Sequence, residues 1–171
     1  MVLVPDLCRS SEGANQIKCG SNLRQIAMTC IIYAQANGGR FPDSVASLHE
    51  GSDLTAEVYN CPSSNAIRAQ GPTTRATADL LRDSPPAGAP DCCQSYVYVG
   101  AGLTTAAPAD AVLAYELPVN HAGAGGNVAF ADARVEWHSA KSLNAIVAAA
   151  GAGRAAPPAA AATTRPAAPV R

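Results

Sequence analysis

Cysteine is the residue of this chain with the most varied chemistry, because a thiol can cross-link, bind a metal or pack as a small apolar group. The chain of 171 residues has six. Cys8, Cys19 and Cys30 recur at intervals of eleven, which on a helix places them on one stripe, about 16 Å apart at a rise of about 1.5 Å per residue. Within one helix they cannot share a disulfide or a metal ion. We therefore interpret them as packing residues.

The other three cysteines, Cys61, Cys92 and Cys93, lie in loop-like sequence. A disulfide from Cys61 to Cys92 or Cys93 would close the segment between them in an oxidising compartment. A zinc site would favour a C-x-x-C spacing, which the sequence lacks. Metal binding is therefore the weaker interpretation of these cysteines.

Polar residues gather around a second region, where His121, Asp132, Glu136 and His138 flank an expected hairpin. Strand alternation puts Glu136 and His138 on the face away from the core, which favours a solvated pair over a set of ligands. The glycine-rich loop after His121 leads into a strand and opens no helix, so it lacks the geometry of a phosphate-binding loop. No nucleophile elbow or Cys–His signature is present. We expect no enzymatic activity.

The elements that position these residues begin with one long helix, predicted over residues 5–37. Apolar residues recur there at steps of three and four, the period of one helical face. Gly38 and Gly39 end this helix. Asp43 is predicted to cap a short second helix over 44–49.

The remainder of the chain predicts an antiparallel sheet, so the expected fold class is α+β. Its strands are short runs rich in β-branched and aromatic residues, at 95–100, 112–117, 127–131 and 134–138. The last two strands meet at Asp132-Ala133, where the turn favours a positive φ that costs Ala133 about 1 kcal/mol. A closing helix is predicted over 141–150.

Composition and charge define the organisation of the chain. A net charge of −1, from twelve basic and thirteen acidic residues, argues against nucleic-acid binding. No apolar run of about 18 residues is present, so the chain as given is expected to be soluble. Three parts are predicted: a long helix over 1–40, a sheet domain over 41–150 with a flexible loop at 71–91, and a disordered Ala/Pro-rich tail over 151–171.

Several short motifs, taken in order, resemble a bacterial family of type IV pilin-like proteins. These proteins are labelled prepilin-type processing-associated, carry an H-x9-DG motif, and are similar to pseudopilins such as the type II secretion protein G. The residues that carry the resemblance are ANQIKCGSNLRQI at 14–26, GRFP at 39–42, YNCPS at 59–63, SYVYVG at 95–100, His121, and NVAFADARVEW at 127–137.

The sequence departs from the family pattern in three ways. Ten residues rather than nine separate His121 from Asp132, and Ala133 replaces the glycine of the motif. Family members begin with a prepilin signal and an apolar helix of about 20 residues, the length that spans a bilayer. Residues 1–7 resemble only the end of that segment. Membrane attachment is therefore expected only through an upstream helix that this sequence lacks.

The resemblance implies a long N-terminal helix packed on the sheet and a non-enzymatic structural role in a type IV pilus or a type II secretion-like assembly. Its partners would be other pilin-like subunits or assembly components, in the cell envelope or an extracellular filament if the upstream helix exists. Lys18 and Arg24 are expected to be exposed, either as subunit contacts or, more commonly for such charges, on a solvated face. The residues expected to pack the helix on the sheet are Ile17, Leu23, Ile26, Cys30 and Ile31.

Two alternatives centre on the predicted hairpin. In the first, the chain is an envelope-associated binding module with a polar site built from His121, Asn127, Asp132 and Glu136. Asp132 and Glu136 would supply carboxylates to calcium, although calcium is usually coordinated by six to eight oxygen ligands. Apart from this calcium ion, no cofactor is expected. In the second, the chain is a hydrolase in which His121 and Asp132 act together as the general base.

Overall fold

The computed structural model describes residues 5–152, so most of the predicted tail lies outside the described residues. Helices occur together with a four-stranded antiparallel sheet, which confirms the α+β fold class. The elements are α1 (Pro5–Ala36), α2 (Val45–Glu50), the 3-10 helix η1 (Ala56–Tyr59), α3 (Thr74–Arg82), β1 (Tyr96–Tyr98), β2 (Val112–Glu116), the 3-10 helix η2 (Pro118–His121), β3 (Gly125–Phe130), β4 (Val135–Ser139) and α4 (Ala140–Ala152).

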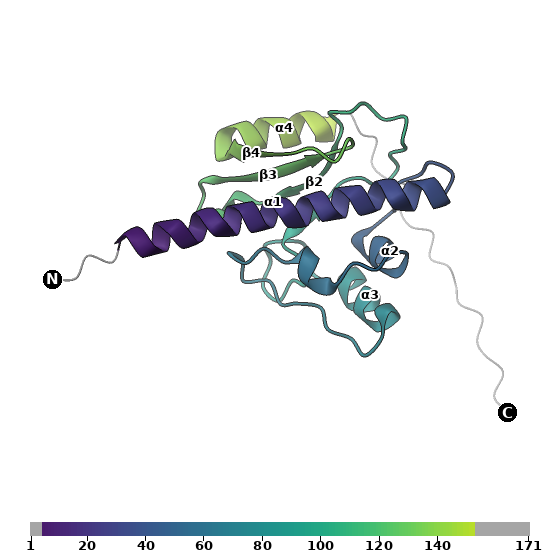
Figure 1. Cartoon of the computed structure of the whole chain (residues 1–171), viewed down its shortest axis with the longest axis horizontal. Coiled ribbons are helices and arrows are strands. Elements are labelled where there is room, and N and C mark those ends of the chain that lie inside the picture. Colours follow the sequence, from purple (N-terminus) through teal and green to yellow (C-terminus); the bar gives the residue numbers. More distant parts are fainter. Residues whose placement is uncertain (1–4, 153–171) are drawn as a thin grey trace.

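The four strands form one antiparallel sheet in the order β1-β2-β3-β4. Neighbouring residues of β3 point to opposite faces, as the strand period of two requires, while β2 has an irregularity in register between Val112 and Ala114. Leu113 and Ala129 join the large apolar cluster that includes residues of α1. Val112 and Val128 join a smaller cluster with Leu143 of α4. The sheet therefore lies between α1 and α4, with α2 and α3 beyond α1 (Figure 1).

Helix α1 contacts β2, β3 and β4, and its first turns project past the sheet (Figure 1). Its buried stripe consists of Cys19, Leu23, Ile26, Ala27, Cys30 and Ala34. Gly38 and Gly39, both with positive φ, follow the helix, and the Gly39 N–H donates to the Ala34 carbonyl at 2.8 Å. This is the expected glycine-assisted end of a helix.

The predicted packing residues of α1 divide into two groups. Leu23, Ile26 and Cys30 are buried and Ile31 is half-buried. Ile17 is wrong as a packing residue, because its side chain is 77% exposed. It precedes the buried Cys19 by two positions, or about 200° around the helix, and so points to the opposite side. Lys18 and Arg24 are exposed.

The segment between α1 and the sheet is more ordered than the sequence predicts. Ser44, not Asp43, caps α2: its side chain accepts a hydrogen bond from the Ser47 N–H at 3.1 Å. The predicted flexible loop at 71–91 contains α3, which is capped by Thr73 and contacts α2. Threonine supplies here the side-chain acceptor that a helix N-terminus requires.

The β3–β4 hairpin turns where the sequence predicts. Ala133 has φ 63°, the left-handed conformation expected at this position. The turn is held by the Ala133 N–H, which donates to the Phe130 carbonyl at 2.9 Å, and by Asp132, whose Oδ1 accepts from the Arg134 N–H at 3.0 Å. Helix α4 continues to Ala152 and so includes the first two positions assigned to the tail.

None of the helices within residues 5–152 combines the length and the apolar character needed to cross a membrane.

Candidate functional site

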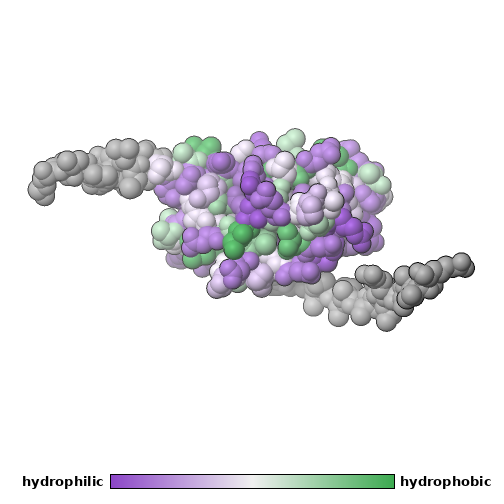
Figure 2. Space-filling view, turned by 90° about the horizontal axis from the view of Figure 1, so that it is seen from below, coloured by the Kyte–Doolittle hydropathy of each residue, from purple (hydrophilic) through white to green (hydrophobic). Residues whose placement is uncertain are grey.

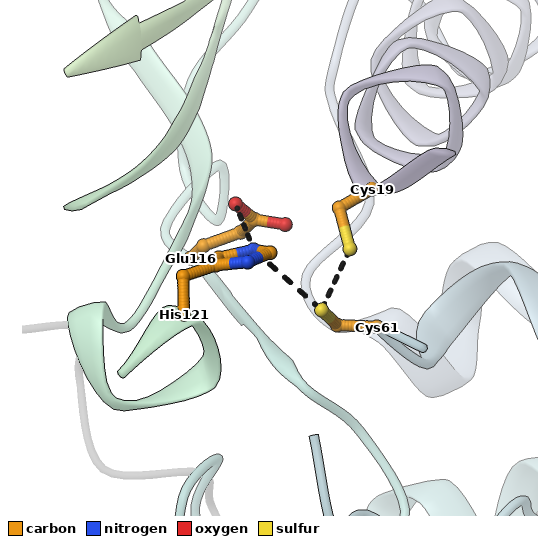
Figure 3. A group of neighbouring side chains, drawn as sticks. All are labelled: Cys19, Cys61, Glu116 and His121. Atoms are coloured by element: carbon orange, nitrogen blue, oxygen red, sulfur yellow. Dashed lines mark hydrogen bonds and ion pairs between the residues drawn. The ribbon is translucent and has the colours of Figure 1, made fainter. Parts of the chain in front are cut away.

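Four buried side chains with metal-binding or redox chemistry converge between α1 and one end of the sheet (Figure 3). They are Cys19 of α1, Cys61 in the segment after η1, Glu116 at the end of β2, and His121 of η2. One ligand atom from each lies within 4.8 Å of the other three. We call these residues the four-residue cluster.

The cluster is a chain of close contacts. The Cys19 and Cys61 sulfurs are 2.6 Å apart. The Cys61 Sγ is 3.7 Å from His121 Nε2, which lies 3.2 Å from Glu116 Oε2. The two sulfurs are closer than unbonded sulfur atoms normally approach, since even carbon atoms in contact are about 3.5–4.0 Å apart.

Each member is held by the element that carries it. Cys61 is fixed through its backbone, whose N–H donates to Ser95 Oγ at 2.9 Å and whose carbonyl accepts from Ser64 Oγ at 2.8 Å. Glu116 is directly opposite Tyr96 of β1 in the sheet register. Pro118 begins the 3-10 turn after β2, which brings His121 back beside Glu116, five residues earlier.

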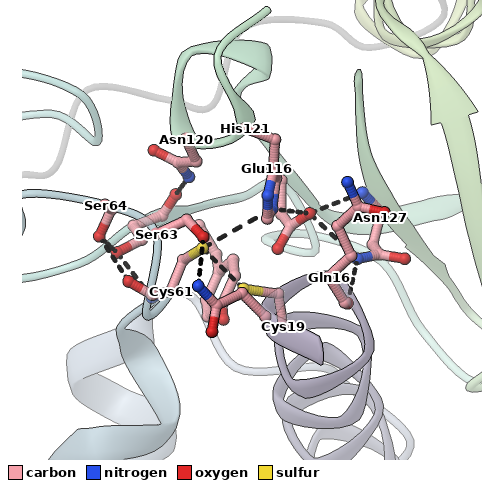
Figure 4. Close-up of polar contacts among 12 residues, drawn as sticks. Gln16, Cys19, Cys61, Ser63, Ser64, Glu116, Asn120, His121 and Asn127 are labelled. Carbon is pink, nitrogen blue, oxygen red and sulfur yellow. Dashed lines mark hydrogen bonds and ion pairs between the residues drawn. The ribbon is translucent and has the colours of Figure 1, made fainter. Parts of the chain in front are cut away.

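Further polar residues surround the cluster, Ser63 and Asn127 among them (Figure 4). One group of polar residues orients His121. The His121 Nδ1 lies 2.5 Å from Glu12 Oε1, while the other oxygen of Glu12 accepts from Ser63 Oγ at 2.8 Å. Asn15 donates to the same Ser63 hydroxyl at 2.9 Å. The Trp137 ring packs edge-on against the imidazole with centroids 5.2 Å apart. His121 is therefore fixed with Nδ1 toward Glu12 and Nε2 toward the cluster.

Glu116 is fully buried and is held on one side by Asn127. Its Oε2 accepts from the Asn127 N–H at 2.8 Å and from Asn127 Nδ2 at 3.1 Å, while Asn127 Nδ2 also donates to the Gln16 carbonyl of α1. Its Oε1 is buried and has no hydrogen-bond partner among the described residues. Gly126 permits this close approach, because a Cβ there would lie 2.8 Å from the Glu116 Cβ.

The contacts shift the pKa values of several groups in and around the cluster. The hydrogen bond with His121 lowers the pKa of Glu12. Burial alone would lower the pKa of His121, but the hydrogen bond to Glu12 and the charge of Glu116 outweigh it and raise the pKa. The hydrogen bond between the sulfurs, donated by Cys19, raises the pKa of Cys19 and lowers that of Cys61.

The structure does not bring the predicted hairpin site together, and that prediction is wrong as a single site. His121 and Asn127 lie beside Glu116. Asp132 follows β3 whereas His121 precedes it, and six strand residues span about 20 Å at about 3.3 Å each. This separation also prevents His121 and Asp132 from acting together as a general base.

The two calcium candidates, Asp132 and Glu136, are already paired with a cation. Arg134 lies 3.7 Å from the Asp132 carboxylate and 3.0 Å from the Glu136 carboxylate. His138 lies 3.4 Å from the other oxygen of Glu136. The carboxylates therefore belong to a partly exposed ion-pair network on β4 and its turn.

The predicted disulfide from Cys61 to Cys92 or Cys93 is absent, because all three are free thiols. Cys61 faces Cys19 instead. The other two are held elsewhere by their backbones: the Cys92 carbonyl accepts from the Ile67 N–H, and the Cys93 N–H donates to Ser84 Oγ.

Sequence reasoning missed Cys19, Glu116 and Glu12 as members of the site. Glu116 left a signal, because it is a lone carboxylate in the apolar run VLAYEL. Such a residue is rarely buried without a partner. Cys19 left none that distinguishes it from Cys30, since both lie on the same buried stripe of α1.

No protein-family model, curated protein or solved structure matches the chain. Chemically, the four-residue cluster can do two things. Its two thiols can lose two electrons and two protons to form a disulfide. Alternatively, two thiolates, an imidazole and a carboxylate can bind a transition-metal ion.

Proposed function

We propose that this protein is a non-enzymatic, pilin-like or pseudopilin-like structural subunit of a type IV pilus or type II secretion-like assembly in the cell envelope. The observation that carries the proposal is the two-sided character of α1. Between Cys19 and Ala34 one side of this 32-residue helix is buried in the core, and the other side exposes large apolar residues to solvent.

The exposed apolar residues share one side of the helix. Ile17, Met28 and Ile32 are 77%, 52% and 62% exposed. Positions eleven and four apart differ by about 20° and about 40° around an α-helix, so the three form a stripe. We call it the outer stripe. Burial of such a stripe would contribute about 25 cal/mol per Å² of apolar surface. A helix from a second copy of this chain is a suitable partner.

Two further features support the proposal. The first turns of α1 project beyond the sheet (Figure 1), where they are placed to meet neighbouring subunits. Residues 14–26, the part of the resemblance that corresponds to the pilin-like helix, lie within α1. In the proposed assembly, α1 packs against the α1 helices of neighbouring copies while the other elements face outward.

The remaining surface fits an outward-facing domain. The face on the side of α2 and α3 is mainly hydrophilic, with small and separated hydrophobic areas (Figure 2). Scattered apolar residues of this kind are normal on solvent-exposed surfaces.

Photo-cross-linking in the native cell tests the proposal. A benzophenone amino acid replaces Ile32 on the outer stripe, and in a matched control it replaces Leu80, an exposed apolar residue of α3. We expect Ile32 to give a ladder of covalent dimers and higher multimers of this chain, and Leu80 to give none. Only monomer at Ile32, or equal ladders at both positions, would contradict the proposal.

A further inference from the structure

We propose that Cys19, Cys61, Glu116 and His121 form a binding site for one divalent transition-metal ion of the Zn²⁺ type. The four ligands come from four separate segments of the chain. A bound ion would therefore tie α1 to both the segment after η1 and the sheet. This inference does not depend on the proposed subunit function.

The donor set selects the class of metal. Two sulfurs, one imidazole nitrogen and one carboxylate oxygen suit a tetrahedral ion of intermediate softness. Calcium and magnesium require oxygen ligands, which only one of the four side chains offers. The cluster therefore favours Zn²⁺ over the calcium considered from the sequence.

The surroundings of His121 match those of a metal-binding histidine. Such a residue usually donates from its other ring nitrogen to a carboxylate, which fixes the tautomer and the orientation of the ring. Here Nδ1 lies 2.5 Å from Glu12, and Ser63 in turn holds Glu12. The Nε2 atom is left to face the Cys61 sulfur and Glu116.

The Glu116 carboxylate supplies an independent observation. It is 0% exposed, and its Oε1 has no hydrogen-bond partner within the described part of the chain. In Figure 3 the oxygen that does not contact His121 is turned toward Cys19. A buried, unpartnered carboxylate oxygen is costly, and a cation in the cluster would compensate it. Disulfide formation between the cysteines would not.

The spacing of the two sulfurs requires an adjustment. Tetrahedral bonds of about 2.3 Å to sulfur place two sulfurs about 3.7 Å apart, so the contact of 2.6 Å between Cys19 and Cys61 must open by about 1 Å. The separation of 3.7 Å from Cys61 Sγ to His121 Nε2 already suits adjacent ligands of one ion. Glu116 Oε2, which also accepts from Asn127, lies 3.2 Å from His121 Nε2, so the carboxylate is beside the imidazole and leaves Oε1 for the ion.

Titration of the reduced, full-length chain with Co²⁺ under anaerobic conditions tests the site. Co²⁺ bound tetrahedrally through thiolates absorbs in the visible, with a sulfur-to-cobalt charge-transfer band in the near ultraviolet. We expect both bands to saturate at one equivalent and to disappear when Zn²⁺ is added. Cys61→Ser and His121→Gln should abolish the bands, whereas Cys92→Ser, which removes a buried thiol outside the cluster, should leave them unchanged.

Glu12→Gln gives a test that does not remove a ligand. Loss of the carboxylate behind His121 should weaken Zn²⁺ binding about 10–100-fold, while circular dichroism shows an intact fold. The proposal is overturned if the folded, reduced wild type shows no thiolate–Co²⁺ bands, if folded Cys61→Ser keeps them, or if folded Cys92→Ser loses them. It is also overturned if mass spectrometry finds Cys19 and Cys61 joined in a disulfide and the protein, after reduction of that disulfide, still does not bind one equivalent of metal.

Discussion

His49 is a buried histidine outside the four-residue cluster, and it makes stability depend on pH. Its ring packs edge-on against Tyr59, and its Nδ1 has no hydrogen-bond partner among the described residues. Burial lowers the pKa of His49 below its usual value. The folded state therefore holds this side chain neutral while the unfolded chain protonates it more readily.

The sign of the effect follows from the lowered pKa. Above the unfolded pKa of about 6.5 both states are neutral at His49 and no free energy is lost. As the pH falls from there through the lower folded pKa, the unfolded state binds the proton first and stability is lost. Urea unfolding at about pH 7.5 and about pH 5.5 should show a larger loss for the wild type than for His49→Gln. An equal loss in both proteins would contradict the assignment.

Ala133 stores strain in the β3–β4 turn because a left-handed backbone costs an L-residue about 1–2 kcal/mol. Its φ of 63° is accessible to glycine without that cost. Ala133→Gly should raise the free energy of unfolding by up to about 1 kcal/mol after the extra entropy of the unfolded glycine is subtracted. The control Ala131→Gly, at a residue of the same turn without positive φ, should lower it. Chemical denaturation measures both, and a destabilised Ala133→Gly would be inconsistent with the strained turn.

At the scale of elements, the N-terminus of α2 is capped by Ser44 and not by Asp43. Ser44 accepts from the Ser47 N–H, whereas Asp43 precedes the cap and is exposed. Ser44→Ala should therefore lower the free energy of unfolding by about 1 kcal/mol. Asp43→Ala should change it by less than about 0.5 kcal/mol. Thermal unfolding followed by circular dichroism distinguishes them, and the reverse order would restore Asp43 as the cap.

The two sides of α1 make opposite predictions for truncation of an apolar side chain. Leu23 is fully buried, so Leu23→Ala should destabilise the chain by about 2–5 kcal/mol. Ile17 is exposed in the single chain, so Ile17→Ala should change stability by less than about 0.5 kcal/mol. Urea unfolding of dilute protein provides the comparison. Similar losses in both variants would mean that Ile17 is covered within one chain.

The helices and strands could be predicted because their causes are local. The period of α1, the glycines after it and the strand runs are all readable along the chain, and the structure places these elements within a few residues of the prediction. Helix α3 was underestimated because the segment is short and polar on average, although its buried residues Thr77, Ala78 and Leu81 share one face and the helix contacts α2. The choice between Asp43 and Ser44 as cap depends on backbone geometry at a single residue, which composition does not fix.

The candidate site could not be predicted because its members come from segments far apart in the sequence. Cys19 and Cys61 are separated by 42 positions, and Glu12 and His121 by 109. Only the packing of α1 against the sheet decides that Cys61 faces Cys19 rather than Cys92 or Cys93. His121 and Asn127 were correctly singled out as polar residues of interest, but their partner is Glu116 and not Asp132.

At the scale of the whole molecule, the proposed metal site and the proposed subunit contacts use different sides of α1. The inner side contributes Cys19 to the cluster and packs in the core. The outer stripe of Ile17, Met28 and Ile32 is left for neighbouring copies. Substitutions in the outer stripe should therefore affect assembly without affecting the fold or metal binding.

The most direct test of the subunit proposal is recovery of the protein from cells that carry its complete coding region. The envelope is sheared, and the released material is sedimented at high speed. We expect the wild type and a Leu80→Glu control to sediment. A variant with glutamate at Ile17, Met28 and Ile32 should stay in the supernatant with an unchanged circular dichroism spectrum. A wild type that never sediments, or a folded triple variant that still does, would contradict a pilin-like assembly through α1.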